Sequence, residues 1–244
     1  MGLAPVWRLR LPAAPAAHPA EKSTAPRPGS IVEKRAAEGG DEAQIRRAAI
    51  ARMEWPGLKE SVAGCEACKL CRSRTHTVFG VGAERADVMI IGEAPGHEED
   101  MRGEPFVGQA GRLLDNMLRA VDLGRDRDVY IANVLKCRPP QNRNPEPLEV
   151  ERCRPYLIRQ IELVAPKLIV AMGRFAAQTL LETDASIASL RGRLFRYQDL
   201  PLVVTYHPAY LLRTLADKAK AWEDLLFMRR HLAALRARDA ANPG

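Results

Sequence analysis

The chain has 244 residues, of which 46% are hydrophobic and 27% are charged, and this length can bury the core of one large or two small domains. The composition excludes a collagenous, fully disordered or disulfide-dense secreted protein, and the lack of an apolar run of roughly 18 residues predicts that the chain does not span a membrane. The net charge of +7 is compatible with an anionic partner, but it is spread along the chain and does not by itself indicate one.

The beginning of the chain differs in composition from the remainder. Six of the 18 prolines lie in Met1–Pro28, which is rich in Ala and poor in large apolar side chains. Such a segment cannot bury enough apolar surface to offset the entropy lost on ordering. We therefore predict a disordered tail at residues 1–48, a helical pattern at Glu42–Arg52 that leads into one folded domain at 49–238, and a disordered C-terminus at 239–244.

Strand and helix patterns alternate after the first cysteine. Short, β-branched runs typical of buried parallel strands lie at Asp87–Gly92, Val129–Val134, Lys167–Met172 and Leu202–Tyr206. Helical patterns lie at Gly111–Val121, Leu148–Val164, Arg174–Leu181 and Ala216–Leu235. The alternation predicts an α/β fold, a three-layer α/β/α sandwich with a central, mainly parallel four-stranded sheet.

Three of the predicted strands end in residues suited to a ligand site. Gly92–Gly96 (GEAPG) follows the first strand, Asn133 ends the second, and His207 follows the fourth. Ligands of open parallel sheets bind at the carboxyl ends of the strands, so we expect these residues to meet there. The GEAPG turn matches neither the phosphate-binding loop of nucleotide hydrolases nor the dinucleotide fingerprint, which argues against a nucleotide cofactor.

Five cysteines form a second motif. Cys65, Cys68 and Cys71 are spaced C-x2-C-x2-C, and Cys137 and Cys153 follow at a distance. Without an export signal, clustered thiols indicate metal ligands rather than disulfides, and a helical stripe turns Cys153 inward. Four thiolates suit Zn²⁺ or a [4Fe–4S] cluster, and the dispersed second pair favours iron–sulfur. Spacing alone leaves open whether Cys71 is a ligand or a bystander.

Four sequence blocks together resemble one family. GEAPG, GEPFVGQAG, KCRPPQNRNP and HPAYLLR occur in the order found in the family 4 uracil-DNA glycosylases, the iron–sulfur branch of the uracil-DNA glycosylase superfamily. The similarity covers roughly Cys65 to Leu235. It implies a structural [4Fe–4S] cluster held by Cys65, Cys68, Cys137 and Cys153, with Cys71 outside the ligand set.

The resemblance also implies a reaction. Family members hydrolyse the N-glycosidic bond of a flipped-out deoxyuridine in DNA, release uracil and leave an abasic site for base excision repair. By the same resemblance Phe106 stacks on the base, the amide of Asn133 reads its edge, and His207 donates a hydrogen bond to uracil O2 as negative charge develops.

The group that activates water is left open by the sequence. Other branches of the superfamily carry an Asp two residues after the first Gly of this motif, where this chain has Ala94. We expect Gly92 and Ala94 to line the base pocket. Glu93 and Glu99 are the candidates for positioning water or uracil, and the alternative is an oxocarbenium-like path that needs little base catalysis. Asn142 matches a further family position in the pocket.

The last block is expected to face DNA. Leu211 is predicted to wedge into the base stack, a task that Tyr210 and Leu212 can share. Phosphates would be contacted without sequence preference by Arg138, Arg143 and Arg213.

Three other functions fit part of the sequence. A redox-sensing, non-catalytic iron–sulfur DNA-binding protein is disfavoured by intact Phe106, Asn133 and His207, and a zinc-structured DNA-binding module would lack colour. The related covalent uracil-DNA binder carries a nucleophilic His in an insertion of the loop after the second strand. Here that loop reads CRPPQNRNP and has neither the insertion nor a His, so turnover is expected. We expect a cytoplasmic, prokaryotic monomer that acts on uracil-containing DNA near the nucleoid, with no membrane association, and a tail that can tether a repair or replication partner.

Overall fold

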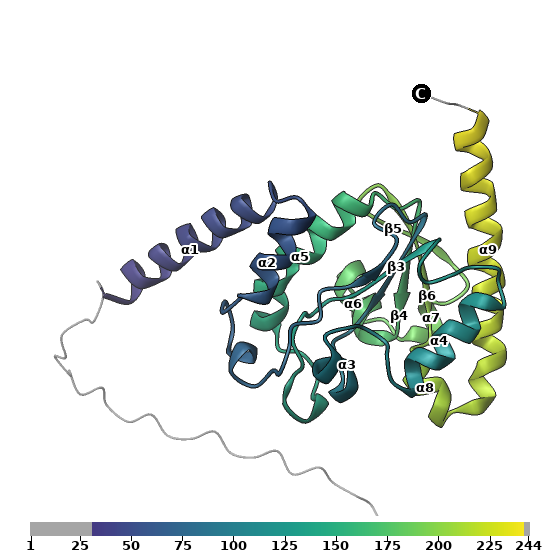
Figure 1. Ribbon diagram of the computed structural model, residues 1–244, viewed down its shortest axis with the longest axis horizontal. Helices are drawn as coiled ribbons and strands as arrows, with labels where there is room; N and C mark the ends of the chain where they lie inside the picture. Colours follow the sequence, from purple (N-terminus) through teal and green to yellow (C-terminus); the bar gives the residue numbers. More distant parts are fainter. Residues whose placement is uncertain (1–30, 242–244) are drawn as a thin grey trace, which may run out of the picture. The chain divides into compact units, whose positions relative to one another are not determined.

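The computed structural model describes residues 31–241, and side chains from residue 41 onward (Figure 1). The chain divides into two units, Met1–Gly40 and Asp41–Gly244. Helix α1 spans Ile31–Ile50 and includes most of the helical pattern predicted near residues 42–52. The part of the predicted tail before residue 31 lies outside the described residues.

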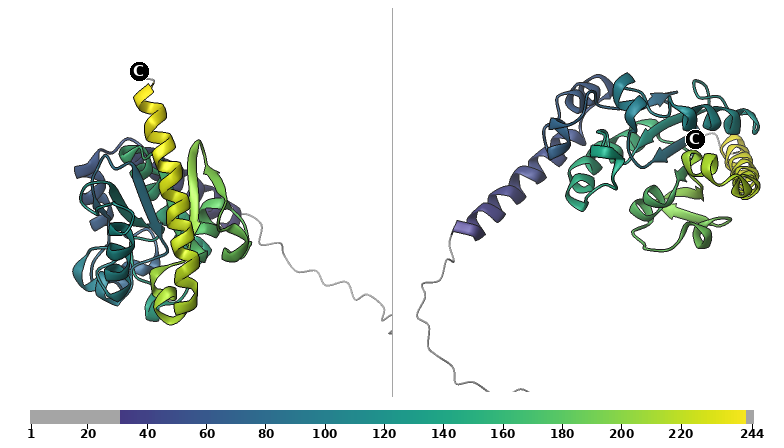
Figure 2. Two further views of the ribbon diagram at one scale, coloured as in Figure 1. Left: turned by 90° about the vertical axis from the view of Figure 1, so that its right-hand side faces the viewer. Right: turned by 90° about the horizontal axis from the view of Figure 1, so that it is seen from below.

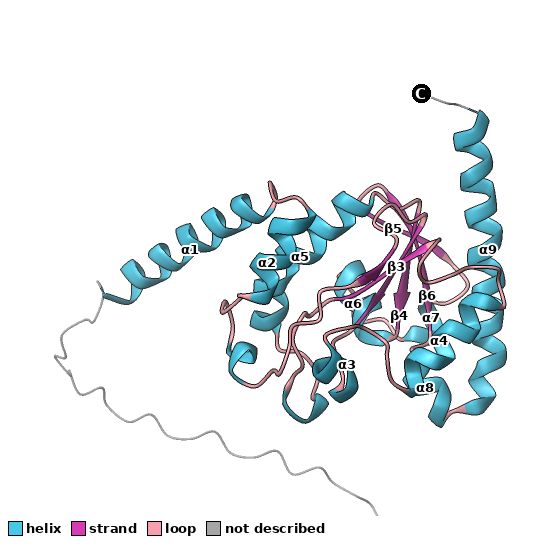
Figure 3. Ribbon diagram, in the orientation of Figure 1, coloured by secondary structure: helices cyan, strands magenta, loops and turns pink. Residues whose placement is uncertain are grey.

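The second unit is built on a six-stranded sheet with the order β1-β3-β2-β4-β6-β5 (Figure 3). The strands are β1 (Val81–Gly82), β2 (Val88–Gly92), β3 (Val129–Asn133), β4 (Leu168–Met172), β5 (Leu194–Tyr197) and β6 (Leu200–Thr205). The four interior strands are parallel, whereas β1 and β5 pair antiparallel at the two edges. The four predicted strands are confirmed, and the predicted strand count is corrected from four to six.

Helices connect the strands. They are α2 (Trp55–Ala63), α3 (His97–Arg102), α4 (Gln109–Arg119), α5 (Pro147–Val164), α6 (Arg174–Leu181), α7 (Ile187–Leu190), α8 (Pro208–Arg213) and α9 (Lys218–Ala241). The predicted helices correspond to α4, α5, α6 and α9. Helices α3, α7 and α8 have six residues or fewer, too short to show a helical hydrophobic period.

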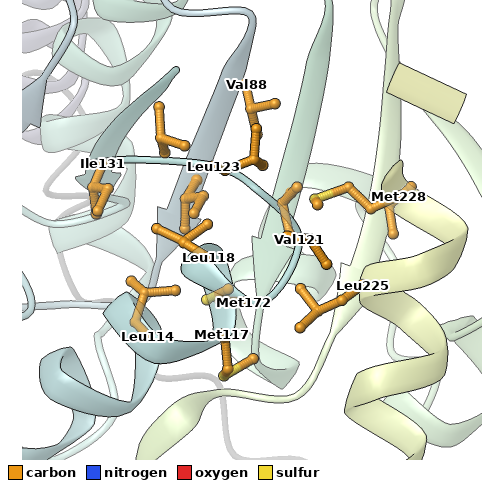
Figure 4. Packing of buried hydrophobic residues seen from close by; sticks show 14 of the residues in the cluster. Val88, Leu114, Met117, Leu118, Val121, Leu123, Ile131, Met172, Leu225 and Met228 are labelled. Atoms are coloured by element: carbon orange, nitrogen blue, oxygen red, sulfur yellow. The ribbon is translucent and has the colours of Figure 1, made fainter. Parts of the chain in front are cut away.

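Alternating side chains of each interior strand pack on opposite faces of the sheet. Val88 and Ile90 of β2 join one core with residues of α4 and α9, and Figure 4 shows Leu114 and Leu225 of these helices there. Met89 and its neighbours on the other face pack against α5 and α6. In Figure 2, α9 (yellow) lies along one face of the sheet. Because strands buried on both faces have no polar side, this packing explains their continuous apolar runs and confirms the three-layer sandwich.

The parallel arrangement brings three strand ends to one edge of the sheet. Gly92 of β2 is paired in register with Asn133 of β3, and β4 lies between β2 and β6. The chain leaves β6 at Thr205 and reaches His207 two residues later. Among the described helices, none combines the length and apolarity needed to cross a membrane.

Candidate functional site

A pocket of about 430 Å³ opens at the carboxyl ends of the strands. This volume is in the range of small-molecule sites. Ten of the residues predicted for the site and its DNA-facing rim line it together: Glu93, Ala94, Glu99, Phe106, Asn133, Asn142, Arg143, His207, Tyr210 and Arg213. A larger groove of about 950 Å³ lies beside α5 and α6, but it contains none of the predicted site residues.

Phe106 is held in an unusual backbone conformation in this pocket. Its φ of 54° lies in the left-handed region, and its side chain is buried. A Cβ on Gly111 would overlap with the Phe106 backbone, and a Cβ on Gly92 would overlap with the Asn133 amide and come within 2.9 Å of the Phe106 ring. Gly92 therefore contributes space rather than a contact. Arg125 donates a hydrogen bond to the Phe106 carbonyl at 2.9 Å. The sequence analysis missed this residue, because a lone arginine in a loop has no pattern that indicates such a contact.

His207 is held in one tautomer by the turn that follows it. Its Nδ1 accepts a hydrogen bond from the Ala209 N–H at 3.1 Å, so the ring proton resides on Nε2. The ring stacks against Phe106 with centroids 5.3 Å apart. Burial lowers the pKa of His207 to about 4, Glu99 opposes this shift, and Arg213 adds to it. At neutral pH the pocket therefore contains a neutral imidazole with an Nε2–H donor.

Glu99 links the two loops that frame the pocket. One carboxylate oxygen accepts from Val107 N at 3.0 Å and Gly108 N at 3.2 Å, and the other accepts from Gly96 N at 3.1 Å. These contacts tie the GEAPG turn to the loop that carries Phe106. Glu99 is thus engaged by the backbone.

The Glu93 carboxyl is the contrasting acid of the pocket. Within the described part of the chain no side-chain or backbone donor bonds to it. Burial raises its pKa, and the charge of Arg174 opposes that shift. Of the two candidate acids, Glu93 is the one with a carboxyl available to hold a water molecule.

The loop after Cys137 forms one wall of the pocket. Asn142 adopts a φ of 55° and accepts from Arg138 Nε at 2.7 Å, while Arg138 Nη1 lies 3.0 Å from His97 Nδ1. Arg143 forms two hydrogen bonds, 2.6 and 2.9 Å long, with the buried carboxylate of Glu149. The guanidinium of Arg143 is therefore already paired with a carboxylate, whereas half-buried Arg138 has no carboxylate partner among the described residues.

The position predicted for the wedge is also corrected. Leu211 is only 1% exposed and packs in the core, so it cannot enter a base stack without leaving that core. Leu212 is 40% exposed, because successive helical residues point about 100° apart. Tyr210 stacks on Tyr206 and lines the pocket beside Arg213.

A second, smaller cavity is lined by four of the five cysteines. These are Cys65, Cys68, Cys137 and Cys153, and the same cavity is lined by the cationic Arg74, Lys136 and Arg152. Cys71, in the turn at Lys69–Arg72, does not line it. The described lining residues include no Asp or Glu.

The sulfur atoms of this cavity face hydrogen-bond donors. Arg74 Nη1 lies 3.2 Å from Cys137 Sγ, Arg46 Nη2 lies 3.7 Å from Cys65 Sγ, and the backbone N–H of residue 136 lies 3.3 Å from Cys153 Sγ. Burial raises the pKa of Cys137 to about 11 and that of Cys153 to about 12. Among residues 41–241 no three His, Cys, Asp or Glu side chains are arranged to hold a metal ion, so the thiols surround a cavity without forming a ready single-ion site.

The chain belongs to the uracil DNA glycosylase superfamily, whose family model matches residues 79–226. The α/β/α sandwich with a pocket at its strand tips agrees with this assignment. Within that superfamily it belongs to the type-4 uracil-DNA glycosylases. It is 46% identical over 163 residues to the type-4 uracil-DNA glycosylase of Archaeoglobus fulgidus, covering 64% of this chain and 81% of the relative. It is 42% identical over 165 residues to that of Thermotoga maritima, covering 67% and 85%.

A more distant relative comes from another branch. The type-5 uracil-DNA glycosylase of Pyrobaculum aerophilum is 32% identical over 146 residues, covering 53% of this chain and 64% of the relative. The higher identity and coverage place this chain with the type-4 proteins.

Proposed function

We propose that this protein is a monofunctional uracil-DNA glycosylase that hydrolyses the N-glycosidic bond of a flipped-out deoxyuridine in DNA. The products are uracil and an abasic site, and the reaction opens base excision repair. The observation that carries the proposal is that Phe106, Asn133 and His207 line one pocket at the strand tips. Membership in the type-4 family supports the choice of substrate.

Base recognition follows from the two groups deepest in the pocket. Extruding a base costs a few kcal/mol, and stacking on an aromatic ring such as Phe106 returns about 1–3 kcal/mol. The Asn133 amide is 2% exposed and offers one donor and one acceptor. This pair matches O4 and N3–H of uracil, whereas the amino group of cytosine would face the amide donor.

Bond cleavage places negative charge on the departing uracil. The Nε2–H of neutral His207 is available to donate to O2, where that charge accumulates. A preorganised donor of this kind contributes about 3–4 kcal/mol to lowering the barrier. We assign Glu93 to holding the attacking water and Glu99 to fixing the loops that enclose the base.

We further propose that Cys65, Cys68, Cys137 and Cys153 hold a [4Fe–4S] cluster. Cation-rich walls without carboxylates suit an anionic thiolate-bound group. When bound, the cluster supplies structural cross-linking rather than a reagent for hydrolysis.

The pocket rim supplies candidate DNA contacts. We assign the wedge to Leu212 in place of Leu211, and phosphate contacts to Arg213 and Arg138. Affinity from such contacts falls with salt and carries no sequence preference. We propose that the enzyme acts as a cytoplasmic monomer.

The proposal is tested by uracil release from an oligonucleotide with a single U:G pair. We expect release by the wild type and about a 100-fold or greater loss of the single-turnover rate in Asn133→Ala and His207→Ala. Asn116→Ala, on the exposed side of α4, and His231→Ala, on α9, are matched controls that should retain the wild-type rate. A wild type that releases no uracil contradicts the proposal.

A further inference from the structure

Lys136 lies between the cysteine cavity and the base pocket. Its side chain is 1% exposed, and lysine is almost never fully buried unless it is paired. Among the described residues no carboxylate forms an ion pair with it. Its Nζ instead donates to the backbone carbonyl of Asn133 at 2.7 Å, and its side chain lines the cavity of the four cysteines. Lys136 therefore contacts the base-reading residue through its ammonium group, and a cysteine of the cavity through its backbone N–H.

The charge of Lys136 needs a counter-charge that the described residues do not supply. A buried unpaired charge is costly. Two further cations, Arg74 and Arg152, line the same cavity, so the local excess is positive. Four thiolates around a [4Fe–4S] core carry net negative charge, so the proposed cluster would balance it. This step rests on the proposed function.

The backbone around Lys136 is tied to both sites. Asn133 is the last residue of β3, and the next residues leave the sheet, with Leu135 N donating to Glu93 O at 3.1 Å. The Lys136 N–H then donates to Cys153 Sγ at 3.3 Å, and its carbonyl accepts from Val78 N at 2.7 Å. The side chain of Lys136 turns back to Asn133, so a loop of four residues is closed by the ammonium group.

We propose that Lys136 is a positioning residue that couples the cysteine cavity to base recognition. Its ammonium holds the Asn133 carbonyl and thereby orients the buried amide that reads uracil. The negative charge of the loaded cavity keeps that ammonium in place. Loss of the side chain then affects two measurable quantities, the cluster content and the rate of uracil release by loaded protein.

The test compares Lys136→Met with Arg74→Met in the full-length protein. Arg74 also faces the cavity and contacts Cys137 Sγ, but it does not line the base pocket. We expect both variants to lose iron per chain and visible absorbance. The single-turnover rate per cluster-loaded molecule should fall by about 10- to 100-fold in Lys136→Met, because small misplacements of a binding group have effects of this size. It should fall by much less in Arg74→Met, because Arg74 contacts Cys137 Sγ and not Asn133.

The Asn133→Ala background separates positioning from general loss of structure. If Lys136 acts through Asn133, Lys136→Met should add less than about a threefold loss in that background. An unchanged rate per loaded Lys136→Met molecule, or an equal further loss in both backgrounds, overturns the proposal. If Lys136→Met is unfolded by circular dichroism, Lys136→Arg is compared in the same two backgrounds. Failure of the wild type to bind iron or release uracil identifies failure of the proposed function instead.

Discussion

At the scale of single residues, the two pocket glutamates differ in what their carboxylates contact. Glu99 accepts three backbone hydrogen bonds, whereas the carboxyl of half-buried Glu93 has no hydrogen-bond donor among the described residues. Hydrogen bonds to a charged group are worth about 1.5–3 kcal/mol, while removing a partly buried charge that has no hydrogen-bond partner costs little stability. The carboxylate of Glu99 therefore holds backbone groups together, whereas the carboxyl of Glu93 is available to a ligand or a water molecule.

This difference predicts opposite results for two equivalent substitutions. Glu99→Gln should lower the free energy of unfolding by about 1–3 kcal/mol, because its NH₂ group faces backbone donors. Glu93→Gln should leave stability within about 0.5 kcal/mol and reduce the single-turnover rate. Chemical denaturation and single-turnover uracil release measure the two effects. An unchanged rate in Glu93→Gln would favour a dissociative path without base assistance.

The stability of the protein should depend on pH through His207. Its pKa is about 4 in the folded protein against 6.5 for an unperturbed histidine. Between these values the unfolded chain binds the proton and the folded chain does not, so stability rises with pH through this window. The contribution is complete above pH 6.5 and is lost as the pH falls toward 4, amounting to at most about 3 kcal/mol.

Denaturation of wild type and His207→Gln across this window measures the effect. The variant should lose less stability than the wild type as the pH falls from about 6.5 to about 4. Because the imidazole is neutral on both sides of pH 6.5, His207 should cause no step in the rate of uracil release at that pH. Parallel stability curves for the two proteins would show that His207 titrates normally.

At the scale of elements, the start of α4 depends on one glycine. A Cβ at Gly111 would overlap with the backbone of Phe106, whose carbonyl is held by Arg125. The helix therefore approaches the pocket loop more closely than any side chain permits. A shift of the Phe106 backbone therefore requires a shift of helix α4.

Gly111→Ala should therefore displace Phe106, with a loss of about 2 kcal/mol or more in stability and a reduced rate of uracil release. Gly57→Ala is the matched control, because nothing lies within 4 Å of its added Cβ in helix α2. This control should be neutral or stabilising by about 0.5–1 kcal/mol. Thermal unfolding and single-turnover assays compare the two, and equal effects would contradict a steric role for Gly111.

The elements that could be predicted from sequence are those buried on both faces. Interior strands such as β2 and β4 have only apolar residues and are bounded by polar segments, so their pattern is local. The edge strands lack that pattern, because β1 has two residues and β5 carries exposed Leu194 and Arg196. The sequence did not distinguish buried Leu211 from exposed Leu212 as the wedge, because a six-residue helix does not reveal its phase.

At the scale of the whole molecule, the cysteine cavity joins distant parts of the chain. Its four cysteines come from a loop before the sheet, from the segment after β3 and from helix α5. A group that binds all four closes long loops and restricts the unfolded state, as other cross-links do. Its contribution is therefore to the stability of the unit as a whole.

Cys153→Ala should lower iron content, visible absorbance and melting temperature together, because it removes a proposed ligand and releases helix α5 from the cross-link. Cys71→Ala is the matched control and should retain all three, since Cys71 lies outside the cavity. Iron analysis, absorbance spectra and thermal denaturation of the two variants check this. Equal loss of absorbance in both would show that the ligand set is wrong.

The site was predictable only where a residue type and its place on a strand coincide. Asn133 and His207 follow buried strands, so the strand-end rule and the family resemblance located them. Lys136 and Arg125 act through backbone carbonyls that they meet only in the folded chain. A lone basic residue in a sequence carries no sign of such a contact.

The strand order determines at which stage of folding the base pocket can form. Asn133 and His207 extend from β3 and β6, which are separated in the sheet by β2 and β4. Residues from β2 through His207 are all needed to complete the pocket, so a nascent chain that still lacks β6 should be unable to bind an extruded base. Uracil bound at the tips would in turn protect amides of all four strands from hydrogen exchange together, because its binding energy is available only to the completed sheet.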